Sequence, residues 1–282
     1  MNSVFIRHHT RYEYDNHVFL EPHIIRLIPR TDSYLKLHSL TVSVTPEPAG
    51  ISCMVDLDGT TAKSVWFSGV TQTFDIVVES VVNVTPINPF HFLIDPLSCT
   101  CLPMVYPHQI EKIITPYLSG TESTPAVSQF AVECASAADY VTLQFLTTVC
   151  ERIGSGFTYT KRDDGDPKSP EETLRTGSGA CRDFAVLAMA VYREFGIASR
   201  FASGYTIASD LRGTEELHAW VEVFLPGAGW KGLDPTNGLA CTENYIVLSA
   251  SADYRLTAPV AGTFRGNSAG RMTTDITVEH KA

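Results

Sequence analysis

A single cysteine lies between a glycine-rich loop and an apolar run, in the sequence GSGACRDFA at residues 177–185. The apolar run 184–195 is dense in alanine, leucine and methionine, and Gly196 follows it, which is typical of a helix and its C-terminal stop. We therefore expect Cys181 in the first turn of a mostly buried helix. Unpaired N–H groups at a helix N-terminus stabilise an anion, so this position favours a reactive thiolate.

A histidine and an aspartate follow the cysteine on two segments that read as strands. His218 lies in the alternating run 217–224, and Asp234 lies in the run 229–236 that follows a Pro-Gly-Ala-Gly turn. Antiparallel pairing of the two runs would bring Asp234 close to His218. The carboxylate would then accept one ring N–H and aim the other ring nitrogen at Cys181. These residue types are the nucleophile, base and orienting group of thiol-dependent acyl transfer.

At these residues the chain resembles the bacterial transglutaminase-like, putative cysteine protease family, whose core belongs to the papain-like superfamily. The three blocks that carry the resemblance are GSGACRDFA at 177–185, LHAWVEVFLP at 217–226 and GWKGLDPTN at 229–237. Their order and spacing match the family, and all three triad positions are intact as Cys181, His218 and Asp234. The resemblance covers roughly the second half of the chain. It implies a cysteine-bearing helix packed on an antiparallel sheet that bears the other two residues.

Four further residues are candidates for oxyanion or substrate contact. Papain-like enzymes take a second oxyanion donor from a side chain upstream of the nucleophile; Tyr159 is our candidate, and its alternative is a half-buried strand aromatic. Arg182 and Asp183 would touch the substrate or, in the interpretation that we favour, pin the helix start to neighbouring loops. Trp220 would line the active site or lie in the hydrophobic core, and the sequence leaves both interpretations open.

Upstream of these blocks the hydrophobic pattern changes twice. Strand-like alternation with regular turn signals predicts an N-terminal β domain over 1–85, sandwich-like and similar to the all-β domain that often precedes this core in bacteria. Seven prolines mark 86–125 as an irregular interdomain connection, which is too apolar for a flexible linker and which we expect to pack along the domain interface. Helical spacing begins near residue 126, so we assign 126–282 to the catalytic core, with the alternating run 271–279 closing the sheet. The expected fold class is α+β.

The composition favours an ordinary folded enzyme over several other classes of protein. The 282 residues are 44% hydrophobic and 18% charged, with a net charge of −10, which provides core material for two domains. Such an acidic chain argues against nucleic-acid and anionic-membrane binding. No apolar run approaches the ~20 residues that span a bilayer, and the N-terminus lacks the pattern of a signal peptide. We therefore expect a cytoplasmic protein with no nucleic-acid or membrane partner.

Cysteine and histidine spacing does not predict a metal site. The seven cysteines are irregularly spaced and odd in number, which favours reduced thiols over a disulfide framework. Cys99 and Cys101 form the one close pair, and no second Cys/His pair stands at zinc spacing. The histidines of the N-terminal region fall on different expected strands without ligand spacing. We expect no metal, and thiol acyl transfer requires no cofactor.

The residues and the resemblance together predict acyl transfer through a thioester. Cys181 attacks an amide carbonyl of a peptide or protein substrate, His218 passes the thiol proton to the leaving amine, and Asp234 fixes the ring tautomer. Water then hydrolyses the acyl-enzyme. The resemblance favours this hydrolytic, protease or amidase, outcome.

The sequence leaves three alternatives open and does not indicate the oligomeric state. An amine in place of water would give protein-glutamine transglutaminase chemistry, because the fate of a thioester depends on which nucleophile reaches it. An arylamine N-acetyltransferase, which also uses Cys-His-Asp, is a more distant alternative. A non-catalytic binding protein that keeps the fold is the alternative from another class, and the intact triad argues against it.

Overall fold

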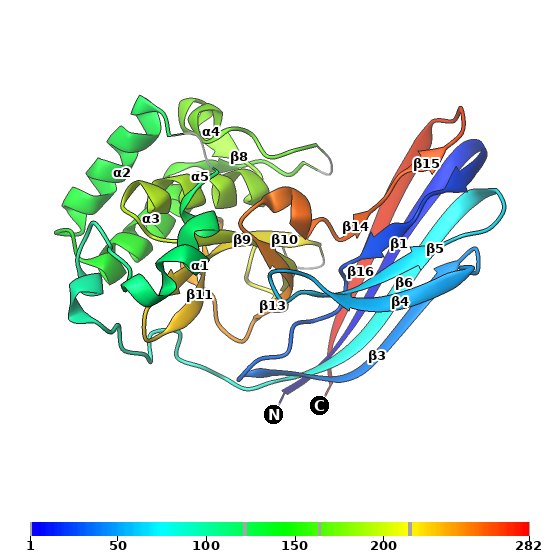
Figure 1. Ribbon diagram of the computed structural model, residues 1–282, viewed down its shortest axis with the longest axis horizontal. Coiled ribbons are helices and arrows are strands. Elements are labelled where there is room, and N and C mark those ends of the chain that lie inside the picture. Colours follow the sequence, from blue (N-terminus) through cyan, green and yellow to red (C-terminus); the bar gives the residue numbers. More distant parts are fainter. Residues whose placement is uncertain (1, 121–122, 163–164, 214–215, 282) are drawn as a thin grey trace.

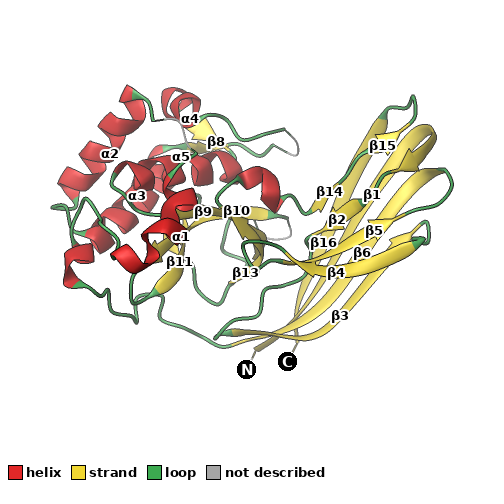
Figure 2. Ribbon diagram, in the orientation of Figure 1, coloured by secondary structure: helices red, strands yellow, loops and turns green. Residues whose placement is uncertain are grey.

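The computed structural model describes residues 2–120, 123–162, 165–213 and 216–281 (Figure 1). The chain folds into a β unit and a helix-and-sheet unit that lie side by side, with both termini at one end of the β unit (Figure 2). This is the α+β architecture that the sequence predicts, an N-terminal β region followed by a helix-and-sheet core. None of the described helices is long and apolar enough to cross a membrane.

The β unit is a sandwich of two antiparallel sheets. The first sheet has the strand order β15-β1-β6-β3, with β16 also paired to β1; the second has the order β14-β2-β5-β4. The strands of the first sheet are β1 (Asn2–Leu20), β3 (Leu35–Thr45), β6 (Thr71–Val84), β15 (Phe264–Arg265) and β16 (Gly270–Lys281). Those of the second are β2 (His23–Ile25), β4 (Gly50–Val55), β5 (Thr61–Trp66) and β14 (Val260–Ala261). On β6 every second side chain is buried between the sheets, as the alternation of the sequence predicts.

The C-terminal strand corrects the expected extent of the catalytic core. We assigned 126–282 to the core and expected 271–279 to close its sheet. Instead, β16 pairs antiparallel with β1 along its whole length, from Ser3 opposite Lys281 to Tyr14 opposite Gly270. The alternation correctly indicates a strand, but it carries no information about a partner at the other end of the chain. The core is therefore inserted between two parts of the β unit.

The core packs its helices on one face of a five-stranded antiparallel sheet of order β12-β11-β10-β9-β13. Its strands are β9 (Ser199–Thr206), β10 (His218–Leu225), β11 (Gly229–Asp234), β12 (Leu239–Ala240) and β13 (Tyr245–Ser251). Its helices are α1 (His108–Leu118), α2 (Pro125–Ala137), α3 (Thr142–Gly156), α4 (Pro170–Thr176) and α5 (Cys181–Glu194). Two short strands, β7 (Thr158–Tyr159) and β8 (Ser178–Gly179), pair in parallel beside α5, and 3-10 turns span Leu97–Thr100 and Tyr254–Thr257.

The proline-rich connection is more ordered than its composition indicates. Helix α1 lies within the range 86–125, which we expected to be irregular. Met104, Tyr106 and Ile114 are buried in the hydrophobic cluster of the core helices. Much of this segment therefore belongs to the packed core and is not a separate linker.

The sheet of the core separates two hydrophobic clusters. On β10, Ala219, Val221 and Val223 pack against the helices. On the opposite face, Tyr205 of β9 and Ile246 of β13 join the cluster that fills the β sandwich. The two units therefore share one continuous apolar interface, and the sandwich supports the sheet that carries His218 and Asp234.

A buried ion-pair group connects the two units beside this apolar interface. Glu222 of β10 is 3% exposed. Its Oε2 accepts hydrogen bonds from Arg200 Nε of β9 at 2.7 Å and from Arg30 Nη1, in the segment between β2 and β3, at 3.2 Å. The Arg30 main-chain N–H also donates to Val247 O of β13 at 2.8 Å. Burial by itself raises the pKa of Glu222, but the charges of the two arginines outweigh it and lower the pKa to about 2.

We predict that Glu222→Gln strongly destabilises the protein. Removal of this carboxylate charge leaves two guanidinium groups without their common counter-ion at a buried interface, an effect of about 3–5 kcal/mol. Urea denaturation measures the change. The matched control is Glu79→Gln, because Glu79 forms a surface ion pair with Arg7 at 3.6 Å and its loss costs less than about 1 kcal/mol. Equal losses in the two variants would contradict the structural role of Glu222.

Candidate active site

Cys181 is the first residue of α5, as the sequence predicts. Ala180 is the N-cap with extended backbone, and the apolar face of α5 is buried from Phe184 onward. The helix ends at Glu194, with Phe195 as its C-cap. Gly196 follows with φ 72°, the left-handed conformation that glycine adopts most readily. The main-chain N–H groups of Cys181 and Arg182 precede the first hydrogen bond of the helix, whereas the Asp183 N–H donates to Ala180 O at 3.0 Å. Cys181 is 9% exposed.

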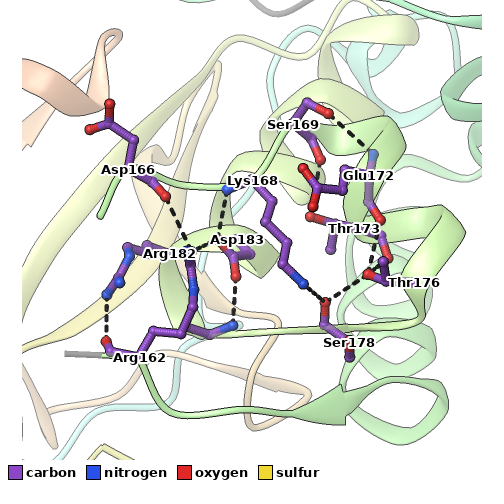
Figure 3. A network of polar contacts seen from close by, with 11 residues as sticks. Arg162, Asp166, Lys168, Ser169, Glu172, Thr173, Thr176, Ser178, Arg182 and Asp183 are labelled. Carbon is purple, nitrogen blue, oxygen red and sulfur yellow. Dashed lines mark hydrogen bonds and ion pairs between the residues drawn. The ribbon is translucent and has the colours of Figure 1, made fainter. Parts of the chain in front are cut away.

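The start of α5 is held by a buried carboxylate, Asp183 (Figure 3). Asp183 Oδ2 accepts from the Ala180 N–H at 2.7 Å, and Oδ1 accepts from Arg162 Nη2 at 2.6 Å and from the Lys168 N–H at 2.8 Å. Arg182 Nη1 donates to Arg162 O at 2.9 Å. These contacts support the interpretation that Asp183 and Arg182 pin the helix start to the preceding loop.

Glycine is required where this loop crosses the pinned helix start. A Cβ atom at Gly179 would lie 2.8 Å from Cβ of Asp183 and 3.1 Å from the ring of Phe184. The glycine-rich sequence before Cys181 thus brings β8 into direct contact with the first turn of α5.

His218 and Asp234 meet across the hairpin of β10 and β11. The register places Val221 opposite Leu233 and Glu222 opposite Gly232, so His218 and Asp234 are diagonal neighbours. His218 Nε2 lies 2.8 Å from Asp234 Oδ2, and the two side chains are 1% and 0% exposed. Because a carboxylate is only an acceptor, Nε2 carries the proton in this contact. Nδ1 is the nitrogen that remains for the thiol.

The Asp234 carboxylate accepts hydrogen bonds from more groups than the sequence indicates. Oδ2 also accepts from Asn237 Nδ2 at 2.6 Å and from the Tyr245 hydroxyl at 2.8 Å, and Oδ1 accepts from the Thr236 N–H at 2.8 Å. Asn237 lies in the block GWKGLDPTN, and an Asp followed three residues later by Asn in a turn is a signal that would have found it. No local signal identifies Tyr245, because β13 reaches Asp234 only through the sheet.

The polar contacts shift the pKa values of the pair apart. Burial by itself lowers the pKa of His218, but the charge and hydrogen bond of Asp234, with smaller contributions from Cys181, outweigh it and raise the pKa to about 10. Burial would raise the pKa of Asp234, yet His218, Asn237 and Tyr245 hold it below its usual value. His218 is therefore an imidazolium near neutral pH, the form that stabilises a neighbouring thiolate. Nδ1 of His218 is buried and makes no hydrogen bond within the described residues.

A cleft of about 830 Å³ gives access to Cys181 and His218. Arg182 and the loop after β7 line one side. The β unit supplies another side, through residues 271–274 and Ile276 of β16. This cleft is thus lined by both units. The N-terminal sequence does not indicate this, because the strand involved lies at the C-terminus.

Trp220 and Tyr159 do not appear among the described residues that line this cleft. Trp220 is 1% exposed and stacks on the His218 ring, with centroids 6.1 Å apart and planes at 27°. It supports the imidazole from the protein interior. Tyr159 lies on β7 beside the strand that leads to Cys181, and its hydroxyl donates to Glu216 Oε1 at 3.4 Å. Burial raises the pKa of Tyr159, so the hydroxyl keeps its proton and its ability to donate.

The described residues contain no group of three or more His, Cys, Asp or Glu side chains that could hold a metal ion. All seven cysteines are free thiols. Cys134 and Cys150 are buried in α2 and α3, where burial raises the pKa of both thiols. Cys181 differs from them because it faces a cleft together with a histidine.

Family models match both units of the chain. Residues 4–83 match the bacterial transglutaminase-like N-terminal region, and residues 128–235 match the transglutaminase-like superfamily. The second match includes Cys181, His218 and Asp234. It ends before β14 and β16, the strands that return to the β unit.

Similar proteins extend over most of the chain. An uncharacterized protein of Mycobacterium bovis is 28% identical over 277 residues, which cover 93% of this chain and 88% of that protein. An uncharacterized protein of Mycobacterium leprae is 33% identical over 128 residues, 43% of this chain and 44% of that protein. The crystal structure of a putative cysteine protease from Cytophaga hutchinsonii has a TM-score of 0.73 at 17% identity, and covers 99% of this chain and 90% of that one.

The structural match shows the fold over the whole chain, and the two family models identify its units in the order in which they occur. The chain therefore belongs to the transglutaminase-like superfamily and carries the N-terminal region of its bacterial members.

Proposed function

We propose that the protein is a cysteine-dependent acyl-transfer enzyme that acts on peptide or protein amide bonds, with hydrolysis as its main outcome. One observation carries this proposal. Cys181 and His218 line one cleft, the buried Asp234 is hydrogen-bonded to His218, and Cys181 contributes to the raised pKa of His218. The geometry provides a nucleophile, a proton carrier and an orienting group in one place.

The reaction follows from the roles of these three side chains. The Cys181 thiolate adds to the amide carbonyl, and the first-turn N–H groups of α5 stabilise the oxyanion that forms. His218 Nδ1 donates its proton to the leaving amine as the C–N bond breaks, which leaves a thioester and a neutral imidazole. Asp234 keeps the other proton on Nε2 throughout. No cofactor takes part in this sequence.

The neutral imidazole then activates the second nucleophile. His218 Nδ1 accepts a proton from water, the hydroxide adds to the thioester carbonyl, and the C–S bond breaks to release the acid and restore the thiolate–imidazolium pair. The cleft of about 830 Å³ is large enough for water or a primary amine to reach the thioester. We propose hydrolysis because of the similarity to a putative cysteine protease. A primary amine that reached the same carbonyl would instead give the transglutaminase product.

We predict that Cys181 is alkylated by iodoacetamide much faster than the other cysteines already at pH 6. In the proposed mechanism the imidazolium of His218 stabilises the Cys181 thiolate, which is the form that iodoacetamide alkylates. His218→Ala should slow labelling at pH 6 by at least about tenfold. Peptide mass spectrometry measures each site, and the exposed Cys101 in the same sample is the internal reference. Labelling of Cys181 that follows the pH profile of Cys101 would contradict an activated thiol.

A second prediction separates the two outcomes of the thioester. Incubation with casein and a biotinylated primary amine should yield mainly new peptide termini, with little biotin incorporated into glutamine side chains. Cys181→Ala should abolish both products, because each requires the thioester. Incorporation of the amine in excess of cleavage would favour the transglutaminase alternative. Full activity of Cys181→Ala would overturn the mechanism itself.

The raised pKa of His218 predicts a pH-dependent contribution to stability. Folded His218 holds its proton more tightly than an ordinary histidine of pKa 6.5, so the contribution is fully present below pH 6.5 and is lost as the pH rises through about 10. Asp234→Asn removes the charge that raises this pKa. We expect the unfolding free energy of the wild type to fall more steeply than that of Asp234→Asn between these pH values, measured by urea denaturation under reducing conditions. Parallel curves would contradict the assignment.

A further inference from the structure

The strand β16 has one paired edge and one open edge. Within the described residues it pairs with β1, and no strand lies on its other side. Residues 270–275 are all exposed. An open strand edge presents main-chain N–H and C=O groups at regular spacing, and these can pair with another extended segment.

The hydrogen-bond register shows which groups face the open edge. The Asp15 N–H donates to Ala269 O at 3.1 Å, in line with the register that places Tyr14 opposite Gly270. Hydrogen-bonded and non-hydrogen-bonded pairs alternate along an antiparallel ladder. Arg271 and Thr273 therefore bond to β1, whereas the main-chain groups of Met272 and Thr274 point away from β1 to the open edge.

This open edge runs along the catalytic cleft. The four consecutive residues 271–274 all line the cleft that contains Cys181 and His218. Successive side chains of a strand point to opposite faces, so a cleft that touched one face would be lined by every second residue. Four residues in a row indicate that the cleft meets the strand at its edge.

The other end of β16 is closed by the core. The His280 ring donates from Nε2 to Ile207 O at 2.9 Å, just beyond the end of β9, and Ile276 is buried in the cluster shared by the two units. The segment from Gly270 to Thr274 is thus the part of the edge that remains accessible, and it is the part beside the catalytic residues.

We propose that the substrate binds as an extended peptide segment that adds a strand to the open edge of β16, with main-chain hydrogen bonds to Met272 and Thr274. This inference rests on the proposed function and specifies its substrate class, an unfolded or loop segment of a peptide or protein. A folded helix cannot supply the pairing groups, because its own main-chain groups are already bonded. The occupant is the substrate because the edge opens into the cleft where the acyl group must lie to reach Cys181.

Strand addition also explains why the β unit is part of the enzyme. The core alone supplies the reactive groups, and β16 supplies a wall with regularly spaced donors and acceptors. Such pairing recognises the main chain and leaves selectivity to alternate side chains of the bound segment. The substrate class is therefore defined by conformation first and by sequence second.

A peptide electrophile tests the proposal without knowledge of the natural substrate. The probe is acetyl-Thr-Val-Thr-Val-Ala chloromethyl ketone, which alkylates a thiolate at the end of an extended segment. Two analogues carry an N-methyl group on adjacent residues, the second valine or the second threonine, and so block opposite edges of the peptide strand. We expect the parent probe to alkylate Cys181 faster than iodoacetamide does, and one analogue alone to lose about tenfold.

Proline at the open edge removes the matching group from the protein. Thr274→Pro deletes an N–H that faces the cleft and keeps the bonds of β16 to β1, since proline is tolerated where a strand edge is unpaired. We expect Thr274→Pro to slow alkylation of Cys181 by the parent probe by about tenfold. The N-methyl analogue that already reacts more slowly with the wild type should not react more slowly still with this variant.

A matched control lies at the opposite edge of the same sheet. The alternation continues across β1 and β6, so that Ser43 of β3 bonds to Val77 and the Val42 N–H faces away from β6. Val42→Pro therefore makes the same change far from the cleft and should react with the parent probe as the wild type does. Iodoacetamide labelling is measured in parallel as a report on the thiol alone.

The outcomes test the proposed function and strand addition separately. Failure of Cys181 to react preferentially with iodoacetamide in the wild type overturns the proposed function. Preferential iodoacetamide labelling, together with equal rates of the parent probe in wild type, Thr274→Pro and Val42→Pro, overturns strand addition alone. Equal slowing of Thr274→Pro and Val42→Pro also overturns it, because the effect would then come from the sheet as a whole.

Discussion

The buried hydrogen bond between His218 and Asp234 is the interaction on which the rest of the site depends. A carboxylate with no exposure to water is stable only when its oxygens are fully bonded. Asp234 meets this requirement through His218, Asn237 and Tyr245, together with the main chain of Thr236. Those groups lie on β10, β13 and the turn after β11. The carboxylate therefore fixes the relative positions of three segments as well as the tautomer of the imidazole.

The position of β10 in turn depends on the β unit. One face of the core sheet packs on helices and the other packs on the sandwich, so the sheet is buried on both sides. Glu222 lies on the same strand as His218 and is bonded to Arg30 of the β unit. A shift of the sandwich would therefore displace β10 at a point four residues from His218. The two units form one packed structure around the candidate site, although their sequences match separate family models.

The parts of the site that were predictable are those in which local sequence determines local structure. The position of Cys181 follows from a glycine-rich loop before an apolar run, and the approach of His218 to Asp234 follows from two alternating runs joined by a turn. Tyr245 and Glu222 carry no such signal, because their partners are brought to them by sheet pairing and interface packing. Trp220 shows the limit clearly: period-2 alternation puts it on the same face as His218, but only the packing shows that this face is interior.

The largest difference from the sequence interpretation concerns strand partners. The alternation of 271–279 predicted a strand correctly, yet the neighbouring core sequence gave a wrong partner. Pairing between β1 and β16 joins the two ends of the chain, and its free energy is gained only after the inserted core has brought these ends together. Long-range pairing of this kind depends on the whole fold and leaves no trace in either segment.

An exposed strand edge is ordinarily a hazard, because it invites pairing with the sheet of another molecule. On β16 the surroundings of the edge resolve this conflict. The core stands opposite residues 271–274 and forms the other walls of the same cleft. A sheet of another molecule that approached this edge would meet the core, whereas a single extended segment adds only one strand. In the proposed binding mode, the arrangement that shields the edge from other sheets is thus also the one that would direct a single peptide segment toward Cys181.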